Sequence, residues 1–367
     1  MKNIAVFFGG TTVEHDVSVI TGVLTLNSLS ATKYNSVPVY IHTDGLWYTG
    51  ESLKDLDDYA NLNIKKLQQV TVVAGKDFLY AVIKGKKLKS ICNLSAAINC
   101  LHGERGEDGC LAGLLAMCAI PLASPSILPS AISIDKCFTK TVMKGLKIKT
   151  LPYVTLTPND DIKKVTEKFN FPIIIKPAYL GSSVGIHTAE NKNELASGVA
   201  DAFRFGEKVI IEPKISDYKE INCACYFDGR KVIVSECEQP IGKGDYLSFE
   251  DKYTQGKRVF PADISKDLSD RIKTITEKVY LALNFNGVIR IDYFVKGEEV
   301  LLNEINSVPG SLAFYLFSDT LKGFSEMLDK MISESQSRFA RSTTQSRKFS
   351  SGILSFGGSK GAKGKKK

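Results

Sequence analysis

Apolar residues in the first third of the chain are grouped in short continuous runs that end in glycine or polar residues. Such runs are typical of strands buried on both faces of a parallel sheet, and an apolar segment between two of them predicts the crossover helix of a βαβ unit. We therefore predict an α/β domain over residues 1–125. Its predicted strands are NIAVFFGG (3–10), NSVPVYIH (35–42) and AAINCLHG (96–103), and its predicted helices are DVSVITGVLTLNSL (16–29) and GCLAGLLAMCAI (109–120).

The second half of the chain alternates apolar and polar residues with a period of two, as half-exposed antiparallel strands do. We expect an α+β fold there, with a substantial antiparallel sheet and a helix around residues 193–203. Beyond Ala340 the composition changes to Ser, Thr, Gly and Lys, which predicts a disordered tail. The predicted strands are EKVIIEPKI (207–215), KEINCACYFDGRKVIVSECE (219–238), GVIRIDYFV (287–295) and VLLNEINSV (300–308).

The last two of these strands carry four polar residues whose spacing predicts a metal site. Arg290 and Asp292 lie on the face opposite to the apolar residues of their strand, and Glu304 and Asn306 share one face of the next. A three-residue turn over residues 297–299 would pair position 292 with 304 and position 290 with 306. Two facing carboxylates repel each other by up to about 1 kcal/mol on an exposed sheet, and a divalent cation reverses that sign.

Oxygen ligands of this kind suit Mg²⁺ and do not suit zinc. The arginine beside them would add a fixed positive charge for an anion near the metal. The alternative is a surface hairpin with scattered charge, in which a shift of register by one residue separates the pairs.

A glycine-rich loop follows another predicted strand, in the segment IIIKPAYLGSSVGI (173–186). A tight turn of this composition would present backbone N–H groups and hydroxyls to a phosphate. However, Lys176 precedes the loop, whereas a P-loop lysine follows it, and the pattern G-x-G-x-x-G is absent. Two interpretations stay open, a phosphate-binding loop and an ordinary β-hairpin turn.

The basic character of the chain is confined to its end. The formal net charge is +8, but eight basic residues and no acid lie beyond Ala340, so the remaining 40 basic residues balance the 40 acidic ones. We expect no nucleic-acid-binding face on the folded domains. The eight cysteines lie mostly in apolar runs without a CxxC pair, which predicts reduced core thiols and no zinc site. Because no run resembles a signal peptide or approaches a membrane span, we expect a cytoplasmic protein that does not bind membranes.

Seven motifs follow one another in one order: FFGGTTVEHDVSV, LHGERGEDG, SIDKCFTK, IIIKPAYLGSSVGI, FEDKY, GVIRIDYFV and NEINSVPG. In this order they resemble the D-alanine–D-alanine ligase family of the ATP-grasp superfamily, from residue 4 to about residue 330. The resemblance implies the ATP-dependent condensation of two D-alanines through D-alanyl phosphate, for peptidoglycan synthesis, and a homodimer, since many members are dimers. It also implies three α+β domains with ATP held between the second and third: an N-terminal substrate-binding domain (1–125), a central ATP-grasp subdomain (126–215) and a C-terminal ATP-grasp subdomain (216–340), before the basic tail (341–367).

The resemblance further implies roles for single residues around ATP and the metal. Arg290 matches the arginine that stabilises the acyl phosphate and the tetrahedral intermediate, and the Gly310 N–H should reach the oxyanion. Glu212 should lie at the adenine hinge, and Glu220 should hold the ribose hydroxyls. The remaining ATP-binding residues are Lys136 and Lys176, expected on the phosphates, with Ser183 and Lys252, and the ligands of two Mg²⁺ (or Mn²⁺) ions are Asp292, Glu304 and Asn306.

On the amino-acid side, Glu14 matches the acid that holds the ammonium of the first D-alanine, with Ser182 and Tyr253 as its partners and His102 close by. Where many members have a Met-Thr-Ser segment ending in a serine for the carboxylate of the second substrate, this chain reads SLAFY, so Ser311 and Tyr315 are the candidates. Simpler interpretations stay open. Glu14 completes a capping box, Thr11-x-x-Glu14, at the first helix; His102 could be a strand-end histidine bonded to backbone, and Tyr253 could pack within its loop.

Two other functions remain compatible with the sequence. One is a related ligase that joins D-alanine to D-serine; the tyrosine of FEDKY favours D-alanine over D-lactate. The other is a non-catalytic nucleotide-binding module that the basic tail directs to nucleic acid. The presence of both phosphate lysines and of the complete metal set argues against the second alternative, and the tail is then a flexible solubilising extension.

Overall fold

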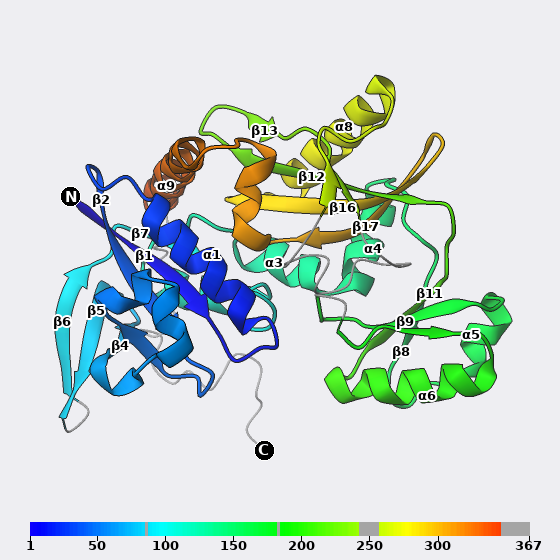
Figure 1. The fold of residues 1–367 in the computed structure, drawn as a ribbon, viewed down its shortest axis with the longest axis horizontal. Coiled ribbons are helices and arrows are strands. Elements are labelled where there is room, and N and C mark those ends of the chain that lie inside the picture. The colour runs from blue at the N-terminus through cyan, green and yellow to red at the C-terminus, as the bar shows by residue number, and fades with distance from the viewer. Residues whose placement is uncertain (85–86, 182–183, 242–256, 346–367) are drawn as a thin grey trace, which may run out of the picture.

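Three large sheets and one two-stranded sheet organise the described residues of the computed structural model, which are 1–84, 87–181, 184–241 and 257–345 (Figure 1). The N-terminal sheet lies at one end of the molecule. The sheet that contains β9 (Ile173–Pro177) and β11 (Val209–Pro213) lies at the other, and the sheet that contains β12 (Lys219–Phe227) and β16 (Val288–Lys296) lies between them. Four of the predicted site residues lie outside the described residues, as does the chain from residue 346 onward. These four are Ser182, Ser183, Lys252 and Tyr253.

The N-terminal sheet has seven strands in the order β6-β5-β4-β3-β2-β1-β7. Its parallel part, β2-β1-β7 with α1 as the crossover helix, confirms the predicted βαβ unit. The antiparallel extension β3 to β6 was not predicted, because its outer strand is almost wholly exposed and carries little apolar pattern. The elements are β1 (Lys2–Gly9), α1 (His15–Ser28), β2 (Tyr34–Ile41), β3 (Trp47–Thr49), β4 (Gln68–Val73), β5 (Lys76–Ile83), β6 (Lys87–Asn93), β7 (Ala96–Asn99) and α2 (Cys110–Met117), with 3₁₀ turns at Glu51–Lys54, Asp57–Asn61 and Ile64–Lys66.

A four-stranded antiparallel sheet of order β10-β9-β11-β8 follows, packed against α5 and α6 by a cluster of buried aliphatic residues. β9 pairs with β10, so the glycine-rich loop joins two strands of one hairpin, as the simpler interpretation of that loop required. The elements are α3 (Ile127–Ile134), α4 (Lys136–Gly145), β8 (Val154–Leu156), α5 (Lys163–Lys168), β9 (Ile173–Pro177), β10 (His187–Ala189), α6 (Lys192–Ala202), the 3₁₀ turn Phe203–Phe205 and β11 (Val209–Pro213).

The third sheet is antiparallel throughout, in the order β13-β12-β16-β17, which confirms the antiparallel sheet predicted for the second half. α8 covers one face and buries Ile272, Val279 and Tyr280 against it. The elements are β12 (Lys219–Phe227), β13 (Val232–Val234), β14 (Gln239–Ile241), β15 (Lys257–Val259), α8 (Lys266–Ala282), β16 (Val288–Lys296), β17 (Glu299–Asn306), the 3₁₀ segment Gly310–Leu316 and α9 (Leu321–Thr343).

The C-terminal helix α9 returns to the N-terminal sheet and packs beside α1 and β7 (Figure 1). Its buried residues Phe324, Leu328 and Ile332 share one apolar cluster with Ile4 and Phe8 of β1. The helix continues to Thr343, three residues beyond Ala340, after which the tail was predicted to begin. Arg341 is held there by an ion pair of 2.7 Å to Glu334.

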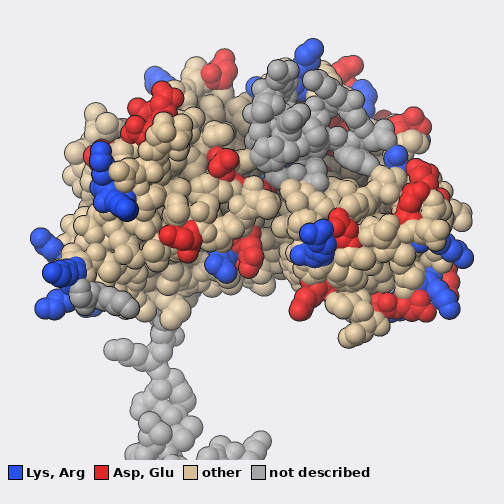
Figure 2. Space-filling view, turned by 60° about the horizontal axis from the view of Figure 1, so that its bottom comes forward, with Lys and Arg blue, Asp and Glu red and all other residues tan. Residues whose placement is uncertain are grey.

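The state of the cysteines, the apolar character of the helices and the distribution of surface charge can be compared with the predictions made from composition. All eight cysteines are free thiols, and six of them are buried. Within the described ranges no helix is both long and apolar enough to cross a membrane. On the face drawn in Figure 2, the basic and acidic side chains of the described residues are intermixed.

Candidate functional site

The β16/β17 hairpin pairs the four polar residues as predicted. Arg290 lies opposite Asn306 and Asp292 lies opposite Glu304. Their apolar neighbours Ile289 and Ile291 are fully buried on the other face. The predicted three-residue turn was wrong: Lys296 pairs with Glu299, so the turn has two residues, and a β-bulge after Asp292 restores the register at the polar pairs.

Asp292 and Glu304 each face a cation. Arg290 donates from Nε and Nη2 to the two oxygens of Asp292 at 2.7 and 2.9 Å, and Asn306 Nδ2 donates to Asp292 at 3.0 Å. Lys136 Nζ lies 3.6 Å from Glu304 Oε2. The bidentate pair fixes the guanidinium plane beside the carboxylates.

The donor set at this hairpin fits a hard divalent cation. Two carboxylates and one amide offer oxygen atoms from neighbouring, partly exposed positions of two strands. The described residues contain no cluster of three or more His, Cys, Asp or Glu with metal-binding geometry.

A second group of charges lies between the β10-β9-β11-β8 sheet and α4. Lys176 of β9 and Lys140 of α4 both contact the carboxylate of Glu212 on β11, at 2.8 and 2.6 Å. Glu212 is 2% exposed. Burial raises the pKa of Glu212, but the two lysines outweigh it and lower that pKa to about 2. Lys140 was missed by the sequence analysis, although its spacing of four from Lys136 places both on one face of a helix.

Lys176 and Lys136 connect this group with the hairpin. Burial opposes the charge on Lys176, but Glu212, Glu304 and Glu220 raise its pKa, so β12 and β17 contribute to its surroundings. Lys136 Nζ also donates to the carbonyl oxygen of Leu180 at 2.6 Å, in the glycine-rich loop. The predicted phosphate lysines therefore lie at one site with the predicted metal ligands.

Glu14 lies where two glycine-containing loops meet. The position of a Cβ on Gly181 would be 3.2 Å from Glu14 Oε1, and that of a Cβ on Gly103 would be 3.0 Å from Oε2. The capping-box interpretation was wrong: α1 begins at His15, and the side chain of Glu14 accepts no capping hydrogen bond from the helix. The carboxylate is 5% exposed and belongs to the space between the loops.

Glu107 joins the loop after β7 to the loop after β17. It was not among the site residues predicted from the sequence. Its two carboxylate oxygens accept from the backbone N–H of Gly103 at 2.9 Å and of Val308 at 3.1 Å. Burial, and then the nearby charges of Glu14 and Glu304, raise the pKa of Glu107 to about 8. An acid inside the glycine-rich motif LHGERGEDG was the available signal.

His102 is buried beside the same loops. Its Nε2 lies 3.3 Å from Thr21 Oγ1 on α1. Burial, and then the nearby charge of Arg290, lower the pKa of His102 to about 4, while a bond to the backbone of Val308 opposes that shift. The imidazole is therefore neutral at physiological pH, and the backbone contact of the simpler interpretation is present as well.

The segment after Gly310 adopts a strained left-handed turn. Ser311, Leu312 and Ala313 have φ values of 50°, 50° and 48°, which cost free energy for residues other than glycine. The Ser311 N–H donates to Thr21 Oγ1 at 3.0 Å, and Leu312 and Ala313 are buried. Arg290 Nη1 donates to the Tyr315 hydroxyl at 3.5 Å, which brings the end of this segment to the hairpin.

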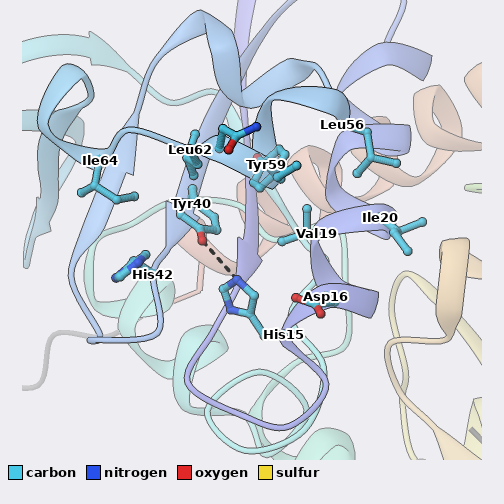
Figure 3. Close-up of a pocket in the computed structure, with 12 residues that line it drawn as sticks. His15, Asp16, Val19, Ile20, Tyr40, His42, Leu56, Tyr59, Leu62 and Ile64 are labelled. Carbon is cyan, nitrogen blue, oxygen red and sulfur yellow. Dashed lines mark hydrogen bonds between the residues drawn. The ribbon is translucent and has the colours of Figure 1, made fainter.

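A separate cavity of about 540 Å³ lies within the N-terminal domain, lined by residues of α1, of β2 and of the segment 56–64. Figure 3 shows His15 directed at Tyr40 across this cavity. His15 Nε2 lies 3.1 Å from the Tyr40 hydroxyl, and Nδ1 lies 2.6 Å from the Gly10 carbonyl oxygen. Burial, followed by the charges of Asp16 and Asp44, raises the pKa of Tyr40 to about 12, so the hydroxyl keeps its proton. The imidazole thereby ties β2 to the loop before α1.

The chain is similar to known proteins over nearly its whole length. The family model described as D-ala D-ala ligase N-terminus matches residues 3–125, and the one described as D-ala D-ala ligase C-terminus matches residues 142–333. A curated relative, the D-alanine–D-alanine ligase of Thermosipho melanesiensis, is 33% identical over 351 residues, which cover 92% of this chain and 95% of the relative.

Solved structures show the same likeness. The D-alanine–D-alanine ligase of Helicobacter pylori matches with a TM-score of 0.76 and 32% identity, over 91% of this chain and 98% of that one. The VanG D-Ala:D-Ser ligase of Enterococcus faecalis matches with a TM-score of 0.78 and 27% identity, over 91% and 99%. The predicted ATP-grasp fold with an N-terminal α/β domain is thereby confirmed. The chain belongs to the D-alanine–D-alanine ligase family of the ATP-grasp superfamily.

Proposed function

We propose that this protein joins two D-alanine molecules to D-alanyl-D-alanine in peptidoglycan synthesis, converting ATP to ADP and phosphate through a D-alanyl phosphate. Its family membership supports the reaction. The observation that carries the proposal is the pairing of Asp292 with Glu304, beside Arg290 and within 3.6 Å of Lys136. This arrangement offers what phosphoryl transfer requires, namely charge neutralisation and alignment.

The first step activates a carboxylate, which is a poor acyl donor by itself. In our proposal Lys136 and Lys176 bind the phosphates of ATP, together with Ser183 and Lys252. Mg²⁺ or Mn²⁺, held by Asp292, Glu304 and Asn306 as two ions, would neutralise charge on the transferred phosphoryl group.

The nucleoside end of ATP would lie along β11 and β12. Because the Glu212 side chain is engaged by Lys140 and Lys176, we propose that position 212 contacts adenine through its backbone. Glu220, whose charge reaches Lys176, would hold the ribose hydroxyls.

The second step forms the peptide bond. In our proposal Glu14 holds the ammonium of the first D-alanine, with Ser182, Tyr253 and the neutral His102 around it. The amine of the second D-alanine attacks the acyl phosphate, and the developing oxyanion is stabilised by Arg290 and by the Gly310 N–H. Ser311 and Tyr315 would face the second D-alanine, and the strained turn that carries them supports a functional role.

The reaction is tested by measuring ATP turnover and product together. Purified full-length protein with ATP and Mg²⁺ should release phosphate only when D-alanine is added, with D-alanyl-D-alanine detected by mass spectrometry in equal amount. Replacing D-alanine with L-alanine is the matched control. Phosphate release without dipeptide would contradict the proposal.

A ligase for D-alanine and D-serine is the second candidate, because the VanG D-Ala:D-Ser ligase is among the similar structures. Comparing D-alanine and D-serine as acceptors at fixed donor concentration separates the two. We expect the higher kcat/KM with D-alanine, and a much higher value with D-serine would reverse the assignment.

The organisation of the protein is part of the same proposal. We propose domains at residues 1–125, 126–215 and 216–340, a homodimer and a cytoplasmic location. Light scattering on the purified protein tests the dimer. The remaining rival is a non-catalytic nucleotide-binding module that residues 341–367 direct to nucleic acid. It predicts no ligase activity in the full-length protein and loss of nucleic-acid binding when residues 346–367 are removed. We expect ligase activity that this removal leaves unchanged.

A further inference from the structure

The acceptor amino acid brings a further carboxylate into a site that also receives ATP and the first D-alanine, and most cations there already serve carboxylates of the protein. Lys140 and Lys176 share Glu212. Arg290 uses both Nε and Nη2 on Asp292. A carboxylate that leaves water needs a charged partner of its own, since burying it without one is costly.

Arg258 of β15 lies beside Tyr315, one of the residues proposed for the acceptor. Its Nη1 donates to Glu238 Oε1 at 3.0 Å. Among the described residues, its guanidinium makes no second hydrogen bond. The side chain as a whole is 39% exposed. A guanidinium carries five N–H donors and can serve a second carboxylate through another edge.

Two aromatic rings and a buried acid fix this guanidinium in place. Its central carbon lies 4.9 Å from the centroid of the Tyr315 ring and 5.2 Å from that of Phe260. Glu238 is 4% exposed and accepts a weak hydrogen bond from Asn222 Nδ2 at 3.4 Å. The backbones of Glu238 and Asn222 exchange hydrogen bonds of 2.8 and 2.9 Å. These bonds hold the backbone of the acid in place.

Tyr315 stands between the two guanidinium groups. Its ring stacks under Arg258, and its hydroxyl accepts from Arg290 Nη1. Arg290 belongs to the hairpin on which phosphoryl and acyl transfer are proposed. An α-amino acid with its amine toward Arg290 and the acyl phosphate would direct its carboxylate along Tyr315 to Arg258.

We infer that Arg258 binds the α-carboxylate of the acceptor amino acid and makes the enzyme select acceptors with a free carboxylate. The inference rests on the proposed function and deepens it, because it names what the acceptor subsite recognises. Glu238 is the positioning residue that holds Arg258, and Tyr315 is the surface on which it lies.

The test uses D-alaninamide, which lacks a carboxylate and so serves only as an acceptor. Full-length protein receives ATP, Mg²⁺, D-alanine and D-alaninamide at equal concentrations, and mass spectrometry measures the ratio of D-alanyl-D-alanine to D-alanyl-D-alaninamide. Both products come from the same folded molecules, so the ratio does not depend on how much of a variant is folded.

Wild-type protein should favour the free carboxylate strongly, and Arg258→Ala should lower the product ratio about tenfold to a hundredfold, the range of a charged hydrogen bond. Arg258→Lys should recover part of the preference, and Glu238→Gln should lose part of it. Lys257→Ala, on the same strand and exposed, is the matched control and should keep the wild-type ratio.

An unchanged ratio in Arg258→Ala would overturn the inference, and so would wild-type protein that does not distinguish the two acceptors. Should Arg258→Ala yield too little product, the ratio in Arg258→Lys decides in the same way. Wild-type protein that forms neither product refutes the proposed function itself, which separates that failure from failure of the inference.

Discussion

Glu107 accepts a hydrogen bond from the Val308 N–H, and this bond joins the N-terminal domain to the segment that leads to Gly310. The second oxygen accepts from Gly103, in the loop that touches Glu14. This one half-buried side chain therefore joins both loops on which the amino acids are proposed to bind.

The raised pKa of Glu107 predicts a pH dependence of stability. In the unfolded chain this acid titrates near 4.5, and in the folded protein it titrates at about 8, because of burial and then of Glu14. The folded state thus keeps a proton that the unfolded state releases, so the contribution is full below pH 4.5 and is lost as the pH rises through 8. Urea unfolding at pH 5 and pH 8 should show wild-type protein losing more stability over this interval than Glu107→Gln. Parallel losses in the two proteins would refute the assignment.

Arg290→Ala should separate nucleotide binding from chemistry. We expect retained ATP binding, measured by calorimetry, with dipeptide formation reduced at least about a hundredfold, the usual effect of removing an oxyanion donor. Because the substitution also leaves Asp292 without its cation, Arg290→Lys serves as the control: it keeps a charge but loses the bidentate geometry. Turnover close to wild type in Arg290→Ala would remove the arginine from the proposed mechanism.

Lys140→Met should destabilise the fold. Glu212 is buried between two lysines, and removing one partner of a buried pair typically costs about 3 kcal/mol. The exposed Lys144→Met on the same helix should change the free energy of unfolding by no more than about 0.5 kcal/mol. The double variant Lys140→Met with Glu212→Gln should regain part of the loss, since the unpaired charge is gone. Equal effects at 140 and 144 in urea titrations would contradict this pairing.

Glu212 also predicts behaviour in acid. Its pKa of about 2 is below the ordinary value of 4.5, so its contribution to stability is present above pH 4.5 and is lost as the pH falls through 2. Glu212→Gln should flatten the acid side of the stability profile, measured by thermal unfolding from pH 5 to pH 2. An unaltered slope would mean that other carboxylates dominate acid unfolding.

The sequence predicted the pairing of polar residues in the β16/β17 hairpin well, because a period of two decides which residues share a face. It did not predict the two-residue turn. A bulge that leaves Asn303 unpaired shifts the register by one residue and so offsets the shorter turn, and bulges depend on packing around the strands. The capping signal at Glu14 was misleading for a similar reason. The loops that contain Gly103 and Gly181 pack against the Glu14 side chain. These contacts come from distant parts of the chain, so a local sequence motif cannot predict them.

The ion pairs of the site were equally invisible in the sequence. Glu212 lies 36 residues from Lys176 in the chain, and the contact exists because β9 and β11 are neighbours. Periodicity can place each side chain on a face of its own element. It cannot say which elements face each other, so Lys140 and Glu107 became visible only in the folded chain.

Gly181→Ala tests the contact between the glycine-rich loop and Glu14. A methyl group there would lie 3.2 Å from Glu14 Oε1, so the carboxylate must shift by a few tenths of an ångström. Because a shift of about 1 Å can cost a hundredfold in rate, we expect about a tenfold loss of kcat/KM for D-alanine with an unchanged melting temperature. Gly145→Ala, at the end of α4 with no atom within 4 Å of the new methyl, is the control and should keep wild-type kinetics with equal or slightly higher stability. Wild-type kcat/KM in Gly181→Ala would show that Glu14 does not need this close contact to hold the substrate ammonium.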